Sequence, residues 1–227
     1  MGEKYVLCDA SSLISLTSSC LENLLAFFHE RFSTRFIIPQ SVRYEAVERP
    51  LSFKSKIHDF SALRIKDLIQ DGIIDVVPGK EEEKTKKLMK LGNSIFFARG
   101  NPVKLIHLGE TEMLVLSKKL QVNSLLMDER TTRMLVENPI SMKNHLQEEF
   151  GTNVMVNKKN LLDFTAQLKG LDVIRSTELL YLAYENNFFK HFNKLEKQAA
   201  EAALFTLKYS GCAVSFGELK EYSKMIQ

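Results

Sequence analysis

The chain has 227 residues, of which 44% are apolar, so it can bury a full hydrophobic core. Its 31 basic and 28 acidic residues leave a net charge of only +3 at pH 7, and charge alone therefore does not indicate a nucleic-acid partner. Three cysteines without a C-x-x-C pair argue against a zinc ribbon or a disulfide framework. The longest apolar run falls short of the roughly 18 to 20 residues of a membrane helix, so we expect a cytoplasmic protein with no membrane partner.

Strands and helices alternate along the first half of the sequence. The predicted elements are, in chain order, a strand at 5–8, a helix at 11–32 that breaks near 18–19, a strand at 35–38, a helix that begins after Pro39, a helix at 53–71 and a strand at 73–77. A mixed-charge helix at 80–95 follows, and Gly100-Asn101-Pro102 ends it. We interpret the stretch from about 53 to 104 as a charged helical insertion.

The second half adds two strands and then only helices. Strands are predicted at 124–127 and 153–156, and helices at 159–168, 175–184, 194–209 and after the capping box at 215–218. The sequence thus predicts an α/β fold, a three-layer α/β/α sandwich with a central parallel sheet, over residues 1–170. A helical C-terminal extension is predicted for residues 171–227.

Four carboxylates occupy positions that a parallel sheet would bring together. Asp9 and Asp128 each follow a predicted strand, Glu110 begins a helix, and Glu45 lies about two turns into another. Ligands of open parallel sheets bind beyond the carboxyl ends of the strands. Carboxylates gathered there indicate a hard divalent cation such as Mg²⁺ or Mn²⁺.

A simpler interpretation applies to most of these acids. Asp9 and Asp128 could be helix N-caps, and Glu110, Glu112 and Glu129 could favour the positive end of a helix dipole. Glu45 has no such explanation. Its alternative is plain surface exposure, and if its block is misaligned, Glu48 is the next candidate ligand.

The sequence resembles the PIN-domain nucleases in four blocks over about residues 4–168. These blocks are Asp9-Ala10-Ser11-Ser12-Leu13-Ile14, the segment from Pro39 to Glu45, Gly109-Glu110-Thr111-Glu112, and the segment from Leu125 to Arg133. A further segment, 175–180, is similar to the tail of some archaeal PIN proteins. The departures are the length of 53–104, the helical end, and Glu129 where an aspartate is frequent.

The resemblance implies a metal-dependent ribonuclease, of the endonuclease type, that leaves a 5′-phosphate. It assigns catalysis and metal binding to Asp9, Glu45, Glu110 and Asp128, with Ser11 orienting a ligand or the attacking water. Glu112 and Glu129 are secondary ligand candidates, and Arg130 and Arg133 are candidate RNA contacts.

Three functions fit the sequence. The first is a ribonuclease of RNA processing or decay, the second a toxin ribonuclease held by an antitoxin, and the third a PIN-like module that binds RNA or protein without cutting. A homodimer is also expected, because the Ala-rich helix at 194–209 and the segment 179–182 offer apolar faces.

Overall fold

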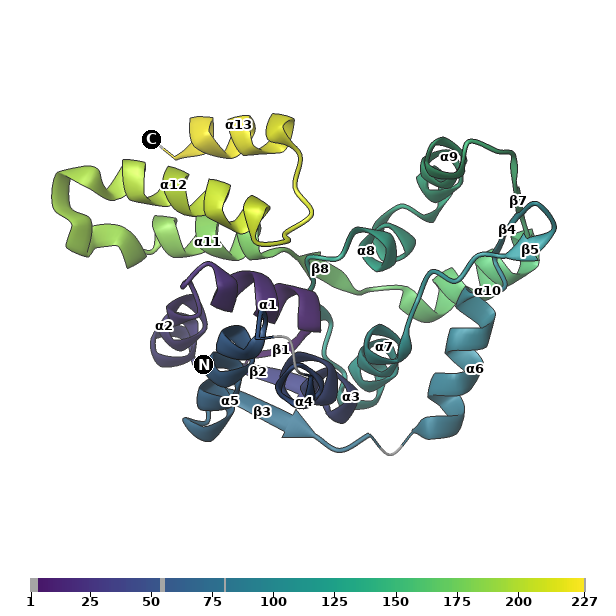
Figure 1. Ribbon diagram of the computed structural model, residues 1–227, viewed down its shortest axis with the longest axis horizontal. Helices are drawn as coiled ribbons and strands as arrows, with labels where there is room; N and C mark the ends of the chain where they lie inside the picture. Colours follow the sequence, from purple (N-terminus) through teal and green to yellow (C-terminus); the bar gives the residue numbers. More distant parts are fainter. Residues whose placement is uncertain (1–3, 54–55, 80, 227) are drawn as a thin grey trace.

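A central parallel sheet organises the protein. The computed structural model describes residues 4–53, 56–79 and 81–226 (Figure 1), and residues 1–3, 54–55, 80 and 227 of the predicted domains lie outside this part. Five strands pair in the order β3-β2-β1-β6-β8, and every pairing is parallel. Their bounds are β1 Lys4–Cys8, β2 Thr34–Pro39, β3 Ile74–Val77, β6 Ser124–Leu126 and β8 Asp172–Ile174. The predicted α/β class is confirmed.

Side-chain alternation along the strands divides the interior into two cores, one on each face of the sheet. Phe36 and Ile38 belong to one core, whereas Ile37, between them, belongs to the other. The first core is built with the helices α1 Ala10–Ser18, α2 Asn23–Phe32, α5 Asp59–Gln70, α11 Ser176–Glu185, α12 Glu196–Tyr209 and α13 Phe216–Met225. The second is built with α6 Glu82–Gly92, α7 Leu108–Leu120, α8 Arg130–Glu137, α9 Pro139–Phe150 and α10 Lys158–Leu168.

A second, antiparallel sheet of order β5-β4-β7 lies beside α6 and α10. Its strands are β4 Phe96–Ala98, β5 Asn101–Pro102 and β7 Val154–Val156. The predicted strand at 73–77 is confirmed as β3 of the central sheet, whereas the β4–β5 hairpin in the same stretch was not predicted. The hairpin turns at Arg99 and Gly100, which have positive φ angles of 51° and 78°. A short apolar run such as 95–97 does not distinguish a helix from a strand by its period, which explains this difference.

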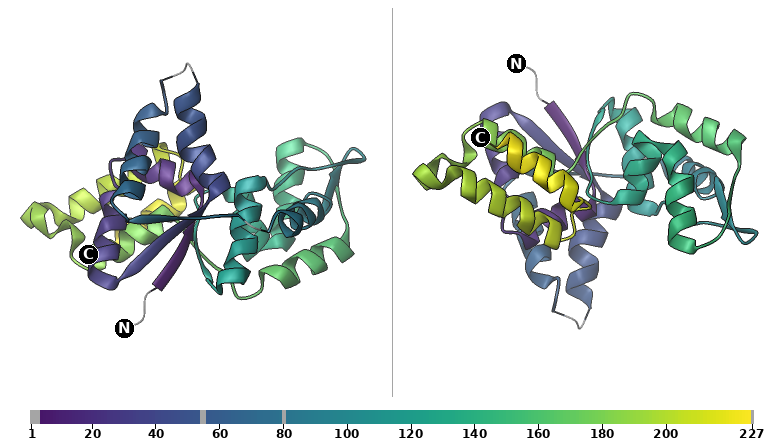
Figure 2. Two further views of the ribbon diagram at one scale, coloured as in Figure 1. Left: turned by 90° about the horizontal axis from the view of Figure 1, so that it is seen from below. Right: turned by 90° about the horizontal axis from the view of Figure 1, so that it is seen from above.

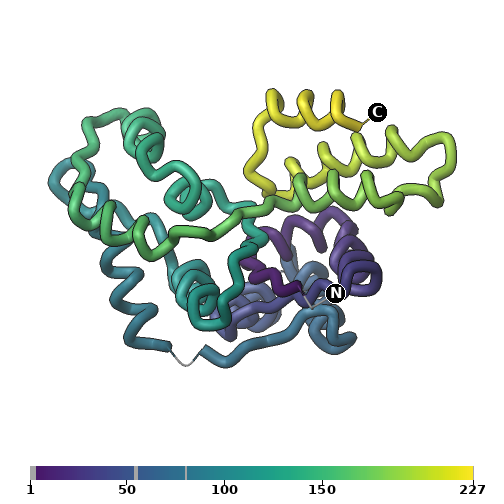
Figure 3. The backbone as a smooth tube through the Cα atoms, turned by 180° about the vertical axis from the view of Figure 1, so that it is seen from behind, coloured from purple at the N-terminus to yellow at the C-terminus, as the bar shows by residue number. Residues whose placement is uncertain are grey.

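The prediction that the chain beyond Gly170 contains only helices is wrong. Strand β8 lies there and pairs with β6 at the edge of the central sheet. The predicted boundary at 170/171 falls just before this strand. The following helices, joined by the 3₁₀ turn Phe188–Leu195, pack against the N-terminal part of the chain: Leu180 and Leu204 share a core with Leu13. Figures 2 and 3 show these C-terminal helices beside α1 and α2, apart from the lobe of α6 and α8–α10.

No single helix among the described residues is long and apolar enough to cross a membrane. The helices α1 and α2 are apolar and long enough only when counted as a pair, and the pair is bent by 109°.

Candidate active site

Asp9 lies where β1 passes into α1 and caps that helix. Its Oδ2 accepts hydrogen bonds from the Ser11 hydroxyl at 2.5 Å and from the Ser11 backbone N–H at 3.2 Å. The residue is only 4% exposed. The pKa of Asp9 is raised to about 6, mainly because the carboxylate is buried. The hydrogen bond from Ser11 lowers this pKa, and the negative charge of Glu45 raises it further.

Ser11 joins the ends of two strands. While its hydroxyl donates to Asp9, its oxygen accepts from the backbone N–H groups of Asp128 at 3.2 Å and Glu129 at 3.0 Å. One side chain therefore fixes the orientation of the Asp9 carboxylate and the path of the chain after β6.

Glu110 stands in the first turn of α7. Its Oε2 accepts from the backbone N–H of His107 at 3.0 Å, so it completes a capping box. Burial is the first cause that raises the pKa of Glu110 to about 7, and the negative charges of Asp9 and Glu45 add to it. The cap interpretation and a role in an acidic site thus hold for the same residue.

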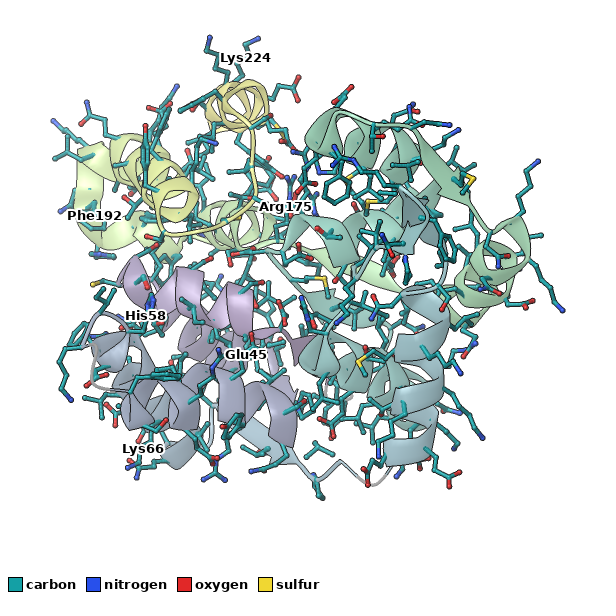
Figure 4. The ribbon with its side chains drawn as sticks, turned by 45° about the vertical axis from the view of Figure 1, so that its right-hand side comes forward. Glu45, His58, Lys66, Arg175, Phe192 and Lys224 are labelled. Atoms are coloured by element: carbon teal, nitrogen blue, oxygen red, sulfur yellow. The ribbon has the colours of Figure 1, made fainter. Side chains whose placement is uncertain are left out.

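Glu45 is exposed and belongs to a π-helical turn, Tyr44–Glu48, between the short helices α3 Gln40–Arg43 and α4 Arg49–Ser52. A π turn widens a helix locally and is frequent at functional sites. Gly109 leaves room for the carboxylate, since a Cβ there would lie 3.1 Å from Oε2 of Glu45. Figure 4 shows Glu45 near the centre of the molecule, between the N-terminal helices and the teal middle of the chain.

Asp128 lies deeper and faces the C-terminal region. It is fully buried, its Oδ1 accepts from the backbone N–H of Ser176 at 2.7 Å, and its carbonyl oxygen accepts from Ala213 at 3.2 Å. Its Oδ2 is buried and meets no N–H or O–H donor among the described residues. The Cys212 thiol lies close by, and burial, together with the Asp128 carboxylate, raises the pKa of that thiol.

The two secondary acids, Glu112 and Glu129, accept hydrogen bonds from nearby segments of the chain. Glu112 accepts from the hydroxyl and the backbone N–H of Ser41, which ties α7 to the start of α3. Glu129 caps α8 by accepting from the N–H groups of Thr131 at 2.8 Å and Thr132 at 2.6 Å. These contacts engage one oxygen of Glu112 and both of Glu129.

The two candidate RNA-contacting arginines differ in their surroundings. Arg130 is exposed, whereas Arg133 is half-buried, donates to the Ala213 carbonyl at 3.4 Å and lies 3.7 Å from Glu137. Both line a groove of about 420 Å³ against the segment between α12 and α13. Of the two, Arg130 is the one whose side chain faces solvent.

Asp9, Glu45 and Glu110 form an electrostatic unit, which we call the acidic group. Their charges act on one another, and none of the three forms an ion pair with a described residue. Within residues 4–53, 56–79 and 81–226, no three Asp, Glu, His or Cys side chains converge closely enough to form a ready-made metal centre. The donor set nevertheless fits a hard divalent cation, because carboxylate oxygens without a cationic partner are the ligands that Mg²⁺ and Mn²⁺ prefer.

Comparison with known proteins places the chain in a family. The family model DUF3368, described as a PIN domain, matches residues 5–139, which is more than half of the chain. The protein therefore belongs to the PIN-domain family, whose members are generally nucleases and usually use divalent metals. No curated protein and no solved structure matched the chain.

Three contacts around the site were not predicted. The Ser176 N–H that holds Asp128 comes from a residue 48 positions away, and Ser41 meets Glu112 across 71 positions. The close approach of Glu45 to residue 109 does have a sequence signal. A glycine directly before Glu110 indicates that something passes where its side chain would be.

Proposed function

We propose that the protein is a divalent-metal-dependent ribonuclease that hydrolyses phosphodiester bonds of RNA in the cytoplasm, in RNA processing or decay. One observation carries this proposal. Burial and mutual repulsion raise the pKa of Asp9 to about 6 and that of Glu110 to about 7, and no described cation relieves them. An acidic group of this kind, with Asp9 buried and Glu110 partly buried, is unfavourable unless a cation joins it.

In this proposal Asp9, Glu45 and Glu110 hold Mg²⁺ or Mn²⁺. Asp128 contributes through Oδ2, since Oδ1 already accepts from Ser176. When bound, the metal supplies a water of lowered pKa and offsets charge on the phosphate. Ser11 positions Asp9 through its 2.5 Å hydrogen bond.

The same observation argues against a module that binds RNA without cutting. Such a module would carry three carboxylates whose charges raise the pKa of Asp9 and of Glu110, and it would gain nothing from them. A binding surface that needs no metal is better served by neutral or basic side chains, because RNA is a polyanion.

The test is incubation of the purified protein with labelled single-stranded RNA, with Mn²⁺ or with a chelator. The wild type should cleave only with Mn²⁺, and Asp9→Asn should lose at least about 100-fold, within the range of losing one group that stabilises transition-state charge. Asp163→Asn, an exposed aspartate on α10, is the matched control and should cleave like the wild type. Equal Mn²⁺-dependent cleavage by Asp9→Asn would overturn the assignment.

A further inference from the structure

A groove opens beside Glu45. It has a volume of about 840 Å³ and runs between the π turn with α4 on one side and the start of α7 on the other. That volume is within the roughly 300 to 1,000 Å³ typical of sites for small ligands. Glu45 and Gly109 both line the groove, and Gly109 directly precedes Glu110, so the groove meets the acidic group at these two residues.

Large side chains stand exposed on its walls. Tyr44, directly before Glu45, is 55% exposed, and Leu108, at the first position of α7, is 54% exposed. His107, the N-cap of α7, is exposed and also lines the groove. Flat and apolar surfaces therefore border the groove where it meets the acidic group, and such surfaces suit a planar ring.

The charges along the groove are partly compensated. Glu48 pairs with Arg43 at 3.2 Å, whereas Glu112 accepts only from the neutral Ser41 and keeps its charge. Arg49 contacts the Phe53 ring, with 5.8 Å between its guanidinium carbon and the ring centroid, and forms no ion pair with a described residue. Glu45, proposed as a metal ligand, and Glu112 are thus the wall carboxylates without a cationic partner among the described residues, and Arg49 is a wall cation that can meet a phosphate of the strand.

We propose that this groove binds an unpaired nucleobase of the substrate, next to the phosphate that is cut, with Tyr44 stacking on the base. The proposal rests on the ribonuclease function proposed above and names the strand that the site accepts. A base within a duplex has both faces stacked, whereas a single strand presents a face to an aromatic side chain. Single-stranded RNA is therefore the expected substrate.

The experiment compares Tyr44→Ala, Tyr44→Phe and the control Tyr209→Ala. Tyr209 is 77% exposed on α12, outside the groove residues. With a short fluorescent RNA and Mn²⁺, Tyr44→Ala should raise KM about tenfold, within the range of one lost base–aromatic stack. Tyr44→Phe should stay within about twofold of the wild type, since it keeps the ring, and Tyr209→Ala should not change. Melting temperatures would confirm that all three variants are folded.

A scan of abasic substrates identifies the nucleotide involved. Removing one base beside the cut should weaken wild-type binding about tenfold, and Tyr44→Ala should lose little more on that substrate, because the two changes remove the same contact. A protein partner in the groove would instead leave KM and the abasic scan unaffected by Tyr44→Ala.

The outcomes separate the two proposals. If the wild type cleaves RNA and Tyr44→Ala matches it in KM and in the abasic scan, the groove proposal is overturned and the nuclease function stands. If the wild type cleaves nothing, yet fluorescence anisotropy shows that Tyr44→Ala binds single-stranded RNA about tenfold more weakly, the nuclease function is overturned and the groove stands. Equal KM for a fully paired duplex would overturn the preference for a single strand.

Discussion

Around Asp9, carboxylates face one another across the ends of β1 and α7, whereas around Arg175 they face a guanidinium. Arg175, at the start of α11, is 7% exposed and bonds Glu178 at 2.9 Å and Glu218 at 2.6 Å. Burial would raise the pKa of Glu218, but hydrogen bonds from Ser215 and Arg175 lower it to about 2. Burial would also raise the pKa of Glu178, but hydrogen bonds from Arg175 and Tyr222 lower it below its usual value.

The difference between the acidic group and this Arg175 network shows that burial alone does not decide the charge state of a carboxylate. With a guanidinium in place the pKa of an acid falls, and without one it rises. The Arg175 network is complete and structural, since its charges are offset within the chain. The acidic group lacks a cation from the described part of the chain, which supports its proposed role as a metal site.

Removing the cation from the complete network should have the largest effect. Arg175→Gln leaves Glu178 and Glu218 without their partner, and breaking a buried ion pair costs about 3 to 5 kcal/mol. Urea denaturation at pH 7 in chelator measures the loss. Lys86→Gln, which breaks an exposed pair with Glu82, is the control and should leave the stability almost unchanged. An Arg175→Gln protein as stable as this control would refute the contrast.

Supplying a cation to the acidic group should have the next largest effect. Mn²⁺ at about 100 times its dissociation constant should stabilise the wild type by roughly 2.7 kcal/mol. Glu45→Gln should weaken this response, because it removes one of the proposed ligands. Glu48→Gln, on the same π turn, should keep it, since Glu48 pairs with Arg43. If the two variants exchange these responses in thermal melts, Glu48 rather than Glu45 is the ligand.

Removing one charge from the acidic group should stabilise the metal-free protein. The pKa of Asp9 is raised from 3.8 to about 6 in the folded state, so folding becomes less favourable as pH rises through 4 to 6. In chelator at pH 7, Asp9→Asn should gain about 1 to 3 kcal/mol and lose that part of the pH dependence. In the wild type, stability falls between pH 4.5 and 2 as Glu218 becomes protonated. Glu218→Gln should lose this part of the pH dependence. Melting curves from pH 2 to 8 test both signs, and a destabilised Asp9→Asn protein would contradict the first.

Formation of a homodimer should change neither the acidic group nor the Arg175 network. Much of the apolar surface predicted to form a dimer is used within the chain, since Leu180, Ala200 and Ala203 are buried. Leu182, Phe192 and Tyr209 stay exposed, and we expect a homodimer through these C-terminal residues; Figure 4 shows Phe192 near the edge of the molecule. Light scattering at tens of micromolar, within the ordinary affinity range, measures it. A monomer at that concentration would count against the prediction.

The sheet and the first acid were predictable because each depends on local sequence. Apolar runs at β1 and β2 are typical of strands buried on both faces, and a carboxylate after such a run must lie at the sheet's carboxyl edge. The break near Ser18 and the capping box at Ser215 also appear as predicted. Local pattern therefore gave the layers of the fold and the end of the sheet at which Asp9 lies.

The remaining features depend on distant contacts that no local pattern records. Strand β8 was missed although β6, which is equally short, was predicted, and β8 is recognised by its pairing with the edge of β6. The partner of Asp128 is a backbone N–H, which any residue at position 176 could supply. The sequence also grouped Asp128 with the other acids, and the structure places its Oδ1 on α11 instead.

The hydrogen bonds to Asp128 have a consequence for synthesis. The family match ends at residue 139, yet the sheet is complete only with Ile174, and Asp128 receives the Ala213 N–H only when that residue has been made. Chains emerge from the ribosome N-terminus first, at about 5 to 20 residues per second. The growing chain therefore carries Asp9, Glu45 and Glu110 for several seconds before Asp128 is fixed, and these contacts of Asp128 can form only after residue 213 has been made.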